Sequence, residues 1–303
     1  MTTISAQIIE DSISPYGVRL CSYQLRYPRW FHPELMTHRA FARNASSSRA
    51  IPVRTMLSRV LENPAEPIHL GLQEKGMQAR AQITDPTARS AALGLWRRAM
   101  HEAVKSAGSL VDDCGLHKQI ANRLTEPWQH MDVVLSATDF ENFFALRCHP
   151  DAEPHFRVLA WRMADAYYGG SSPKPIALGD WHLPYVTAVE RDSVPLESLK
   201  ACSAARCARV SYKLHDGEAV SVEKDLELYK KLVTGLLAGT GDPGHMSPLE
   251  HQATPLDDPK AHSGPFRGWK QFRKEMVGEN ASFDYEAAVA KGWRASAYEI
   301  LPT

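Results

Sequence analysis

The sequence predicts an α+β protein in which an antiparallel or mixed sheet packs against several helices. Residues 6–12 and 17–27 place apolar side chains at strand-like positions, and a Ser-Pro-Tyr-Gly turn separates the two runs. Residues 86–107 carry the apolar spacing of a long helix, opened by an Asp-Pro pair. These observations together define the fold class.

The other elements follow from the same patterns, taken in chain order. Residues 52–63 read as a short amphipathic helix, and residues 64–84 are irregular because Asn63-Pro64 and Pro67 break regular structure. Further helices are expected over 109–124, 140–147, 222–237 and 284–298, with an apolar stretch through 133–135 and a strand-like run that ends at Ser211. In the helix over 140–147, Phe140, Phe143, Phe144 and Leu146 define the buried face.

Composition limits the possible function classes. The chain has 303 residues, 44% of them hydrophobic and 23% charged, which is typical of a soluble globular protein. Its 35 basic and 35 acidic residues leave no net charge, so a general nucleic-acid binder is disfavoured. The first residues lack a secretory signal and no apolar run has membrane-spanning length, so we expect a cytoplasmic protein.

The five cysteines, at positions 21, 114, 148, 202 and 207, show no Cys-x-x-Cys spacing. Free thiols in a reducing compartment are therefore expected, and no metal site is predicted. A Pro-rich stretch divides the chain into a first half over 1–170, a linker over 171–195 and a second half over 196–303, which together form one compact unit.

The most informative segment is the basic, hydroxyl-rich stretch over 37–49. It contains three arginines, one histidine and three consecutive serines, and no acidic residue. Such a stretch is often only a solvated loop. Here, however, Trp30, Phe31, Leu35 and Met36 precede it at helical spacing, and a buried helix that leads into uncompensated positive charge needs an anionic partner. Arginine forks and serine hydroxyls are suited to phosphate oxygens.

This segment resembles the signature of the flavin-dependent thymidylate synthases. That signature reads Arg-His-Arg, seven residues, Ser, and an Arg two positions on. The matching residues are His38, Arg39, Asn44, Ser47 and Arg49, while Thr37 replaces the leading arginine and Ala45 replaces a common glutamate.

Three further blocks resemble the same family in permuted order. One runs from Arg123-x-x-x-Pro127 through Asn142-Phe and Arg147 to Ala152 and Arg157. The other two are Ala208-Arg-Val-Ser211-Tyr and His245-x-Ser247-Pro-x-Glu-His251, which precede the signature in the family and follow it here. The resemblance implies the family fold in circularly permuted order, of a phage-type member. A fainter echo of the signature helix, Phe272-Arg-Lys274, is better explained by coincidence.

Each of these residues also has a structural interpretation. Ser247, Pro248 and Glu250 have the spacing of a helix capping box, which is compatible with flavin binding at the helix N-terminus. Arg147 alone would be expected to pair with Asp151 or Glu153. Ser211 is a turn residue or a flavin contact, and Asn142 is a buried amide or a flavin contact. His155 is expected to be structural, and Cys148 is left without a role.

The family converts dUMP to dTMP, taking carbon from methylenetetrahydrofolate and hydride from reduced FAD, with NADPH as the reductant. By resemblance, Arg147 and Ser47 are the catalytic candidates. The substrate-binding candidates are Glu34, Ser46, Ser47, Ser48, Arg49, Arg123 and Arg147, and the flavin-binding candidates are His38, Arg39, Asn44, Asn142, Ser211, His245 and Ser247. No Gly-x-Gly-x-x-Gly is present, so a Rossmann turn does not hold the flavin.

The resemblance also implies a homo-oligomer, in that family a tetramer with sites shared between chains. Because Thr37 and Ala45 depart from the signature, two alternatives remain open. One is a hydroxymethylase acting on dUMP or dCMP, and the other is an inactive nucleotide-binding scaffold.

Overall fold

The computed structural model describes residues 2–211, 221–237, 245–280 and 283–299. A five-stranded sheet lies at its centre, in the order β3-β4-β2-β1-β5. All neighbouring strands are antiparallel except β1 and β5, which are parallel. The predicted mixed sheet is therefore confirmed. The strands are β1 (Ser5–Ile13), β2 (Arg19–Pro28), β3 (Ala42–Ala45), β4 (His130–Ala137) and β5 (Lys174–Pro175).

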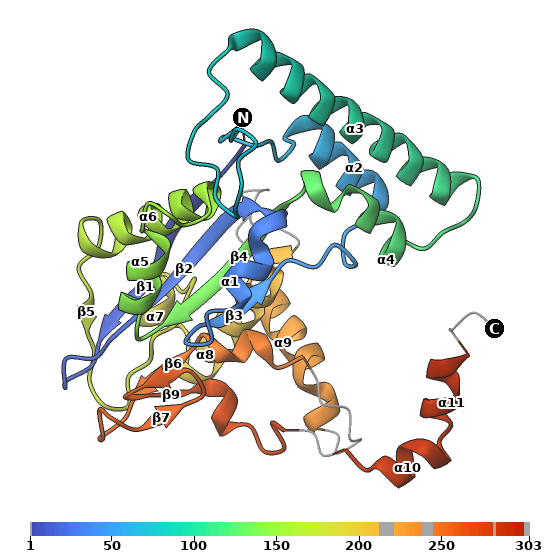
Figure 1. Cartoon of the computed structure of the whole chain (residues 1–303). Helices are drawn as coiled ribbons and strands as arrows, with labels where there is room; N and C mark the ends of the chain where they lie inside the picture. Colours follow the sequence, from blue (N-terminus) through green and yellow to red (C-terminus); the bar gives the residue numbers. More distant parts are fainter. Residues whose placement is uncertain (1, 212–220, 238–244, 281–282, 300–303) are drawn as a thin grey trace.

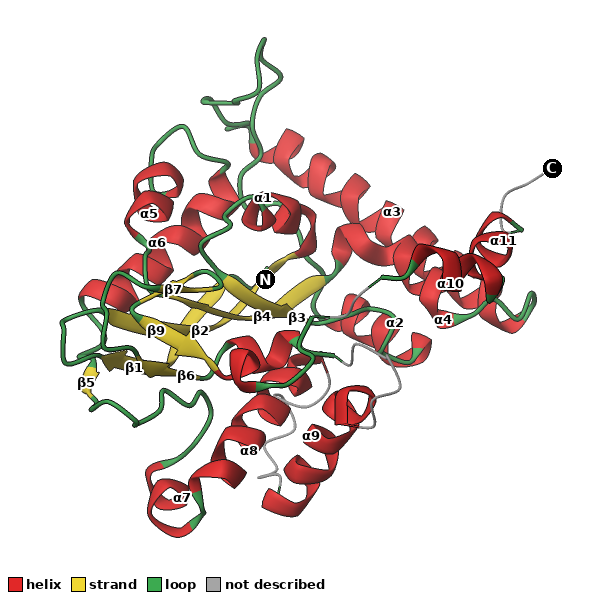
Figure 2. Ribbon diagram, turned by 90° about the horizontal axis from the view of Figure 1, so that it is seen from below, coloured by secondary structure: helices red, strands yellow, loops and turns green. Residues whose placement is uncertain are grey.

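The sheet lies between two layers of helices, as Figure 2 shows. One layer contains α1 (His32–Met36), α5 (Glu141–Arg147) and α6 (Pro154–Tyr168). The main core cluster joins these helices to the sheet through fully buried side chains such as Tyr23, Leu135 and Phe156. The opposite layer contains α8 (Leu196–Ala208) and α9 (Val222–Leu237), while α7 (Ala188–Ser193) precedes them.

The predicted β1–β2 hairpin forms because the Ser-Pro-Tyr-Gly turn matches its geometry. The Gly17 N–H donates to the Ser14 carbonyl at 3.0 Å, and Gly17 has a φ of 78°, which favours glycine. Strand β3 is a short addition at the opposite edge of the sheet. It lies within the basic, hydroxyl-rich stretch, for which the sequence predicted no strand; the helix before that stretch ends at Met36.

Helices α2 (Val53–Glu62), α3 (Pro86–Asp112) and α4 (Lys118–Ala121) form a separate group beside the β3 edge (Figure 1). The expected helix over 109–124 is wrong. Helix α3 continues to Asp112, Gly115 then adopts a left-handed φ of 66°, and only one turn of α4 follows before a 3₁₀ segment that contains Pro127. Glycine ends the long helix and proline prevents the next one from extending.

The C-terminal part adds two small ribbons and two short helices. Residues 284–298 do not form one helix, because Gly292 has a φ of 76° and separates two pieces. Both pieces lie apart from the body of the molecule in Figure 1. The ribbons are β6 (Ala253–Pro255) with β9 (Trp269–Gln271) and β7 (His262–Ser263) with β8 (Phe266–Arg267), and the helices are α10 (Tyr285–Ala290) and α11 (Trp293–Tyr298).

The segment over 171–195, predicted as a linker, is packed against both the sheet and the second helix layer. Its residues 174–175 pair with β1, and the buried side chains of Trp181 and Leu183 belong to a cluster with α8 and α9. Thr187 and Glu190 form a reciprocal capping box at the start of α7. The division of the chain into two halves at this segment stays a prediction.

Three smaller expectations are wrong. The run that ends at Ser211 is not strand-like: residues 196–208 are α8 and residues 209–211 are a 3₁₀ turn. Leu146 is 54% exposed, because α5 turns only its phenylalanine face toward the core. Ser247 is not a helix cap, since residues 247–250 are a 3₁₀ turn without a side-chain cap.

Candidate functional site

Asn44 joins three segments that are distant in the sequence. It lies on β3, is 7% exposed, and donates from Nδ2 to the Cys207 carbonyl at 2.7 Å. Its Oδ1 accepts a hydrogen bond from the Ser247 Oγ at 3.0 Å. Ser247 belongs to one of the two C-terminal blocks with family resemblance, and Cys207 directly precedes the other, which begins at Ala208. The signature segment therefore meets both C-terminal regions, and the amide orientation of Asn44 is fixed from both sides.

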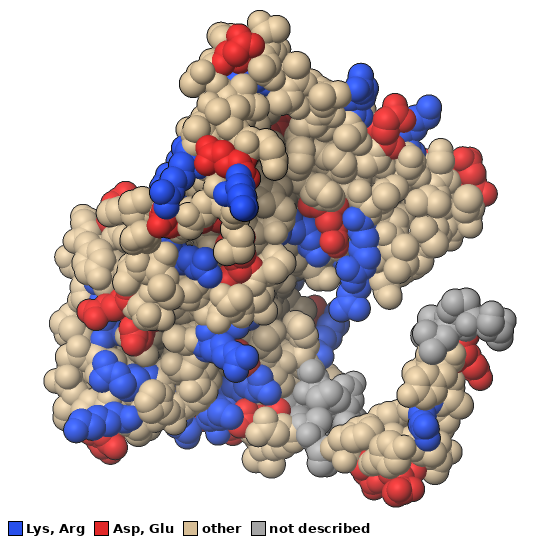
Figure 3. Space-filling view, viewed as in Figure 1, with Lys and Arg blue, Asp and Glu red and all other residues tan. Residues whose placement is uncertain are grey.

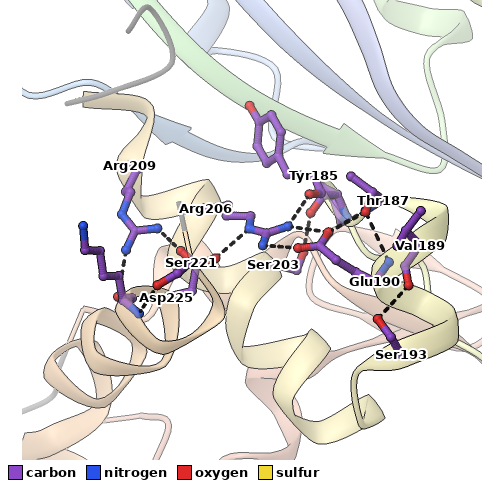
Figure 4. Close-up of polar contacts among 12 residues, drawn as sticks. Tyr185, Thr187, Val189, Glu190, Ser193, Ser203, Arg206, Arg209, Ser221 and Asp225 are labelled. Carbon is purple, nitrogen blue, oxygen red and sulfur yellow. Dashed lines mark hydrogen bonds and ion pairs between the residues drawn. The ribbon is translucent and has the colours of Figure 1, made fainter. Parts of the chain in front are cut away.

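The block around Ser211 is held by an ion network, drawn in Figure 4. Asp225 on α9 is fully buried and accepts from Arg206 Nε at 2.7 Å and from Arg209. Arg206 also donates to Glu190, and this hydrogen bond lowers the pKa of Glu190 to about 2. These two arginines therefore position the block and do not act as free cations.

Arg206 also stabilises a strained backbone position. Its Nη1 donates to the Tyr185 carbonyl at 2.7 Å, and Tyr185 is the non-glycine residue of the described chain with a positive φ, 65°. The Tyr185 hydroxyl donates to Gln24 on β2, as the ring lies toward the sheet in Figure 4. The arginine and the sheet together hold this unfavourable conformation.

A second group of candidate residues surrounds Arg147 at the end of α5. Its Nε donates to His38 Nε2 at 2.9 Å, and its Nη1 lies 3.7 Å from the carboxylate of Glu34. The guanidinium also lies 4.8 Å from the ring centre of Phe156. The expected pairing with Asp151 or Glu153 is wrong, because the helix end points toward the turn after α1. Arg147 thus meets Glu34 and His38, two residues of the signature region.

The protonation state of His38 follows from this geometry. An arginine N–H can only donate, so Nε2 of His38 is an acceptor and the ring proton of the neutral form lies on Nδ1. Burial, followed by the charges of Arg147 and Arg43, lowers the pKa of His38 to about 4. The imidazole is therefore neutral at neutral pH and adds no charge beside Arg147, whose ion-pair partner is the Glu34 carboxylate at 3.7 Å.

The two groups lie on opposite faces of β3. Asn44, with Ala42, points toward the C-terminal elements, whereas Arg43 donates to the carbonyls of Leu35 and His38 and Ala45 packs in the main core. This alternation is inherent to a strand. The same chain therefore presents Arg147 and the Asn44–Ser247 pair to different sides of the sheet.

An open groove of about 810 Å³ borders the Arg147 group. Glu34 forms one wall, the loop over 77–80 another, and the turn between α5 and α6 a third. Arg80 reaches across to Asp151 at 3.3 Å. The volume falls in the range of small-molecule sites, roughly 300–1,000 Å³. Burial and the nearby Glu153 raise the pKa of Glu34 on this wall.

The remaining predicted residues are more dispersed. The Ser46 N–H donates to the Asp132 carbonyl at 2.8 Å, and Ser48 is buried beside Asn122, which donates to its carbonyl. Arg123 is exposed and lies 3.6 Å from Glu126. Exposed side chains belong to Arg39, Arg49, Asn142 and His245, while Ser47 is partly buried and the Ser211 side chain lies outside the described part.

Four of the residues singled out from the sequence need comment. Asn142 is not a buried amide, because it lies on the solvent side of α5. No hydrogen bond or ion pair of the described chain links Arg49 with Arg147 or His245. Burial raises the pKa of the Cys148 thiol, so the reactive thiolate is disfavoured there. His155 is buried and bonds to Glu153 and the Ile68 N–H, as expected for a structural residue.

Sequence reasoning missed a buried polar chain that crosses the sheet. Ser12 bonds to His182 at 2.9 Å, His182 to Ser22 at 2.8 Å, Ser22 to Ser136 at 2.5 Å, and Ser136 to His251 at 2.9 Å. All five side chains are fully buried. Burial lowers the pKa of His251 to about 3 and that of His182 well below its usual value, so both rings are neutral. The only signal in the sequence was a serine in each of the segments that form β1, β2 and β4.

The chain is similar to known proteins at the level of solved structures. No family model matches the chain, and no curated protein matches it. Among solved structures, the UMP/dUMP methylase PolB from Streptomyces cacaoi bound with 5-Br UMP is 16% identical, covers 55% of this chain and 89% of its own, and has a TM-score of 0.45. The same enzyme bound with 5-Br dUMP is 15% identical, covers 55% and 90%, and has a TM-score of 0.43.

Thymidylate Synthase X (ThyX) from Helicobacter pylori, solved with FAD and dUMP, is also similar. It is 15% identical, covers 50% of this chain and 69% of its own, and has a TM-score of 0.34. All three combine low identity with low TM-scores, so function is best argued from the residues of this chain. Within the described residues, no helix is long and apolar enough to cross a membrane, and no group of three metal-ligating side chains is found.

Proposed function

We propose that this protein is a flavin-dependent enzyme of the thymidylate synthase type. It would transfer a one-carbon unit from methylenetetrahydrofolate to C5 of dUMP and release dTMP. One observation carries the proposal: Asn44 of the signature segment is hydrogen-bonded to Ser247 of one C-terminal block and to Cys207, the residue before the other. Chance matches scattered over the sequence would not be expected to share one buried side chain.

Two residues that precede Asn44 and Ser247 in the sequence, Arg39 and His245, would hold the flavin diphosphate. Arg39 and His245 are exposed, and Arg39 has no acidic partner among the residues that the structure describes. Cationic and imidazole donors suit two phosphate groups. Bound FAD, once reduced by NADPH, would supply the hydride that completes the methyl group. Both amide atoms of Asn44 are engaged within the protein, so its role in the proposal is to position the flavin-binding elements.

Arg147 would activate the pyrimidine. Loss of a proton from the ring makes C5 nucleophilic, and a cation beside O2 and N3 stabilises that anionic form. Neutral His38 orients the guanidinium without cancelling its charge, and Glu34 lies 3.7 Å away, beyond hydrogen-bond distance. The groove beside Glu34 is large enough for a nucleotide or for the folate donor.

The Arg147 group and the Asn44–Ser247 pair lie on opposite faces of β3. We therefore propose that each complete site is shared between chains of a homo-oligomer. Mixing two inactive variants tests this idea. Arg147→Gln and Arg39→Gln would each be inactive alone, and mixed subunits would recover part of the activity through sites that carry neither substitution. If mixing restores nothing although mixed oligomers form, the shared site is refuted.

The reaction is tested by tritium release from C5-labelled dUMP and dCMP, each with methylenetetrahydrofolate, NADPH and FAD. Release from dUMP with a methylated product supports the proposal. Release from dCMP, or a hydroxymethylated product identified by mass spectrometry, would replace it with a hydroxymethylase. Flavin-free protein that takes up no FAD and releases no tritium from either nucleotide would refute an enzymatic role and leave a scaffold.

A further inference from the structure

A small cavity lies where the chain leaves β3, at the edge of the sheet. It has a volume of about 30 Å³, enough for roughly two water molecules or one compact polar group. Its lining comes from β2, from α2, and from the segments over 46–51 and 128–132. Figure 3 shows the surface hollowed below α3, with Lys and Arg side chains gathered in the hollow. Ser46 and Ser48 line the cavity, but Ser47 and Arg49 do not.

The charge balance of the lining is positive. Three arginines face one carboxylate, that of Asp132. Arg26 engages Asp132 at 2.8 Å and 3.0 Å, and Arg29 pairs with Glu126 at 2.8 Å. Arg59 on α2 is only partly exposed and has no ion pair or side-chain hydrogen bond within the part of the chain that the structure describes. Its guanidinium therefore remains available to an anion.

Two further side chains of the lining, Trp128 and Ser46, supply donors. The Trp128 side chain is about nine-tenths buried, and its Nε1–H has no acceptor among the described residues. The Ser46 Oγ accepts from the Asp132 N–H at 3.2 Å, which leaves its own O–H to donate. Buried donors without acceptors are unfavourable. The Arg59 guanidinium, the Trp128 indole N–H and the Ser46 hydroxyl can all donate hydrogen bonds. A group that only accepts them, such as an oxyanion, would satisfy all three.

We propose that this cavity binds the 5′-phosphate of the pyrimidine nucleotide, with Arg59 and Trp128 as phosphate ligands beside Ser46 and Ser48. The assignment rests on the proposed function for the identity of the nucleotide. It adds two residues that the signature resemblance does not include, and it places the phosphate on the inner side of the loop that carries the substrate-binding candidates Ser47 and Arg49. Arg59 shares its helix with Met56 and Val60, which line the cavity beside it and set its direction.

The test measures binding of dUMP, deoxyuridine and inorganic phosphate to the full chain by calorimetry. Arg59→Gln should weaken dUMP binding about 10- to 100-fold, as expected for loss of a charge-assisted hydrogen bond. Trp128→Phe, which keeps the ring and removes the donor, should weaken it about 3- to 10-fold. Neither variant should change the affinity for deoxyuridine, which lacks the phosphate. Arg54→Gln is the matched control, since Arg54 is exposed on the same helix and pairs with Asp112.

The outcomes separate this proposal from the proposed function. The cavity is not the phosphate site if Arg59→Gln weakens the binding of dUMP and of deoxyuridine equally. The same conclusion holds if it weakens the binding of neither. If the wild type binds deoxyuridine as tightly as dUMP, the cavity proposal also fails while pyrimidine binding stands. Arg59-dependent binding of inorganic phosphate without any pyrimidine binding would keep an anion site but refute the nucleotide and the proposed function. Near-ultraviolet circular dichroism confirms that each variant is folded.

Discussion

Replacing Asn44 by alanine tests the junction between the signature segment and the two permuted blocks. The substitution removes the donor to the Cys207 carbonyl and the acceptor of the Ser247 hydroxyl, both in a buried region. An unsatisfied buried acceptor costs about 1–3 kcal/mol, and a lost hydroxyl hydrogen bond about 0.5–1.5 kcal/mol. The free energy of unfolding should therefore fall by about 2–4 kcal/mol, or about 5–10 °C in Tm.

The measurement is urea and thermal unfolding of Asn44→Ala, Ser247→Ala and the double variant. Ser247→Ala should lose only about 1 kcal/mol, and the double variant should lose less than the sum, because one hydrogen bond is shared. Asn280→Ala is the control, since Asn280 is exposed, and a change within about 0.5 kcal/mol is expected there. Asn44→Ala should also retain less FAD. An Asn44→Ala protein as stable as the control would contradict the geometry on which the proposed function depends.

Three further predictions concern the other polar groups. Arg147→Gln should lower the rate of tritium release from dUMP about 10²- to 10³-fold with little change in dUMP affinity. Arg98→Gln, at an exposed position, should leave that rate unchanged. Equal rates for Arg147→Gln and the wild type would exclude a role of Arg147 in transition-state stabilisation. The pKa values of His38 and His251 are lowered in the folded protein, so the unfolded chain binds more protons below about pH 6.5. The free energy of unfolding should therefore be full above about pH 6.5 and fall as the pH drops toward 3. A urea midpoint that stays constant over that range would contradict this prediction. Ser136→Ala should lower the free energy of unfolding by about 1–3 kcal/mol because it breaks the buried Ser–His chain. The exposed Ser58→Ala should lower it far less. A Tm shift for Ser136→Ala no larger than that for Ser58→Ala would show that the Ser–His chain does not stabilise the fold.

Local sequence signals specified most of the regular elements. Alternating apolar residues and a glycine turn were sufficient for β1 and β2, and the boundaries of α9 agree with the predicted Val222–Leu237. The failures occurred where local signals competed. Ser247 has the spacing of a capping box but bonds to Asn44 instead, and Glu250 pairs with Arg273. A side chain with two possible partners takes the one that tertiary packing supplies.

For the candidate site, too, the sequence predicted the residues that belong to local motifs and missed those that only the fold brings together. Residue types and motif spacing in the sequence pointed to the basic, hydroxyl-rich stretch over 37–49, to Arg147 and to the block over 245–251, because those features are local. The sequence could not assign Arg59 and Trp128, since an arginine on an amphipathic helix and a tryptophan in a short apolar stretch look like ordinary surface and core residues. Only the folded cavity brings together the Arg59 guanidinium and the Trp128 indole N–H, neither of which has a partner in the described part of the chain.

The sequence by itself determined an α+β composition, a mixed sheet and a set of phosphate-suited side chains, because these follow from periodicity and residue chemistry over short stretches. The tertiary structure alone decided which of those side chains meet. Strand alternation places Asn44 and Arg43 on opposite faces of β3, so that Asn44 contacts Ser247 while Arg147 and His38 lie on the other side. That arrangement depends on long-range strand pairing, which no local pattern encodes.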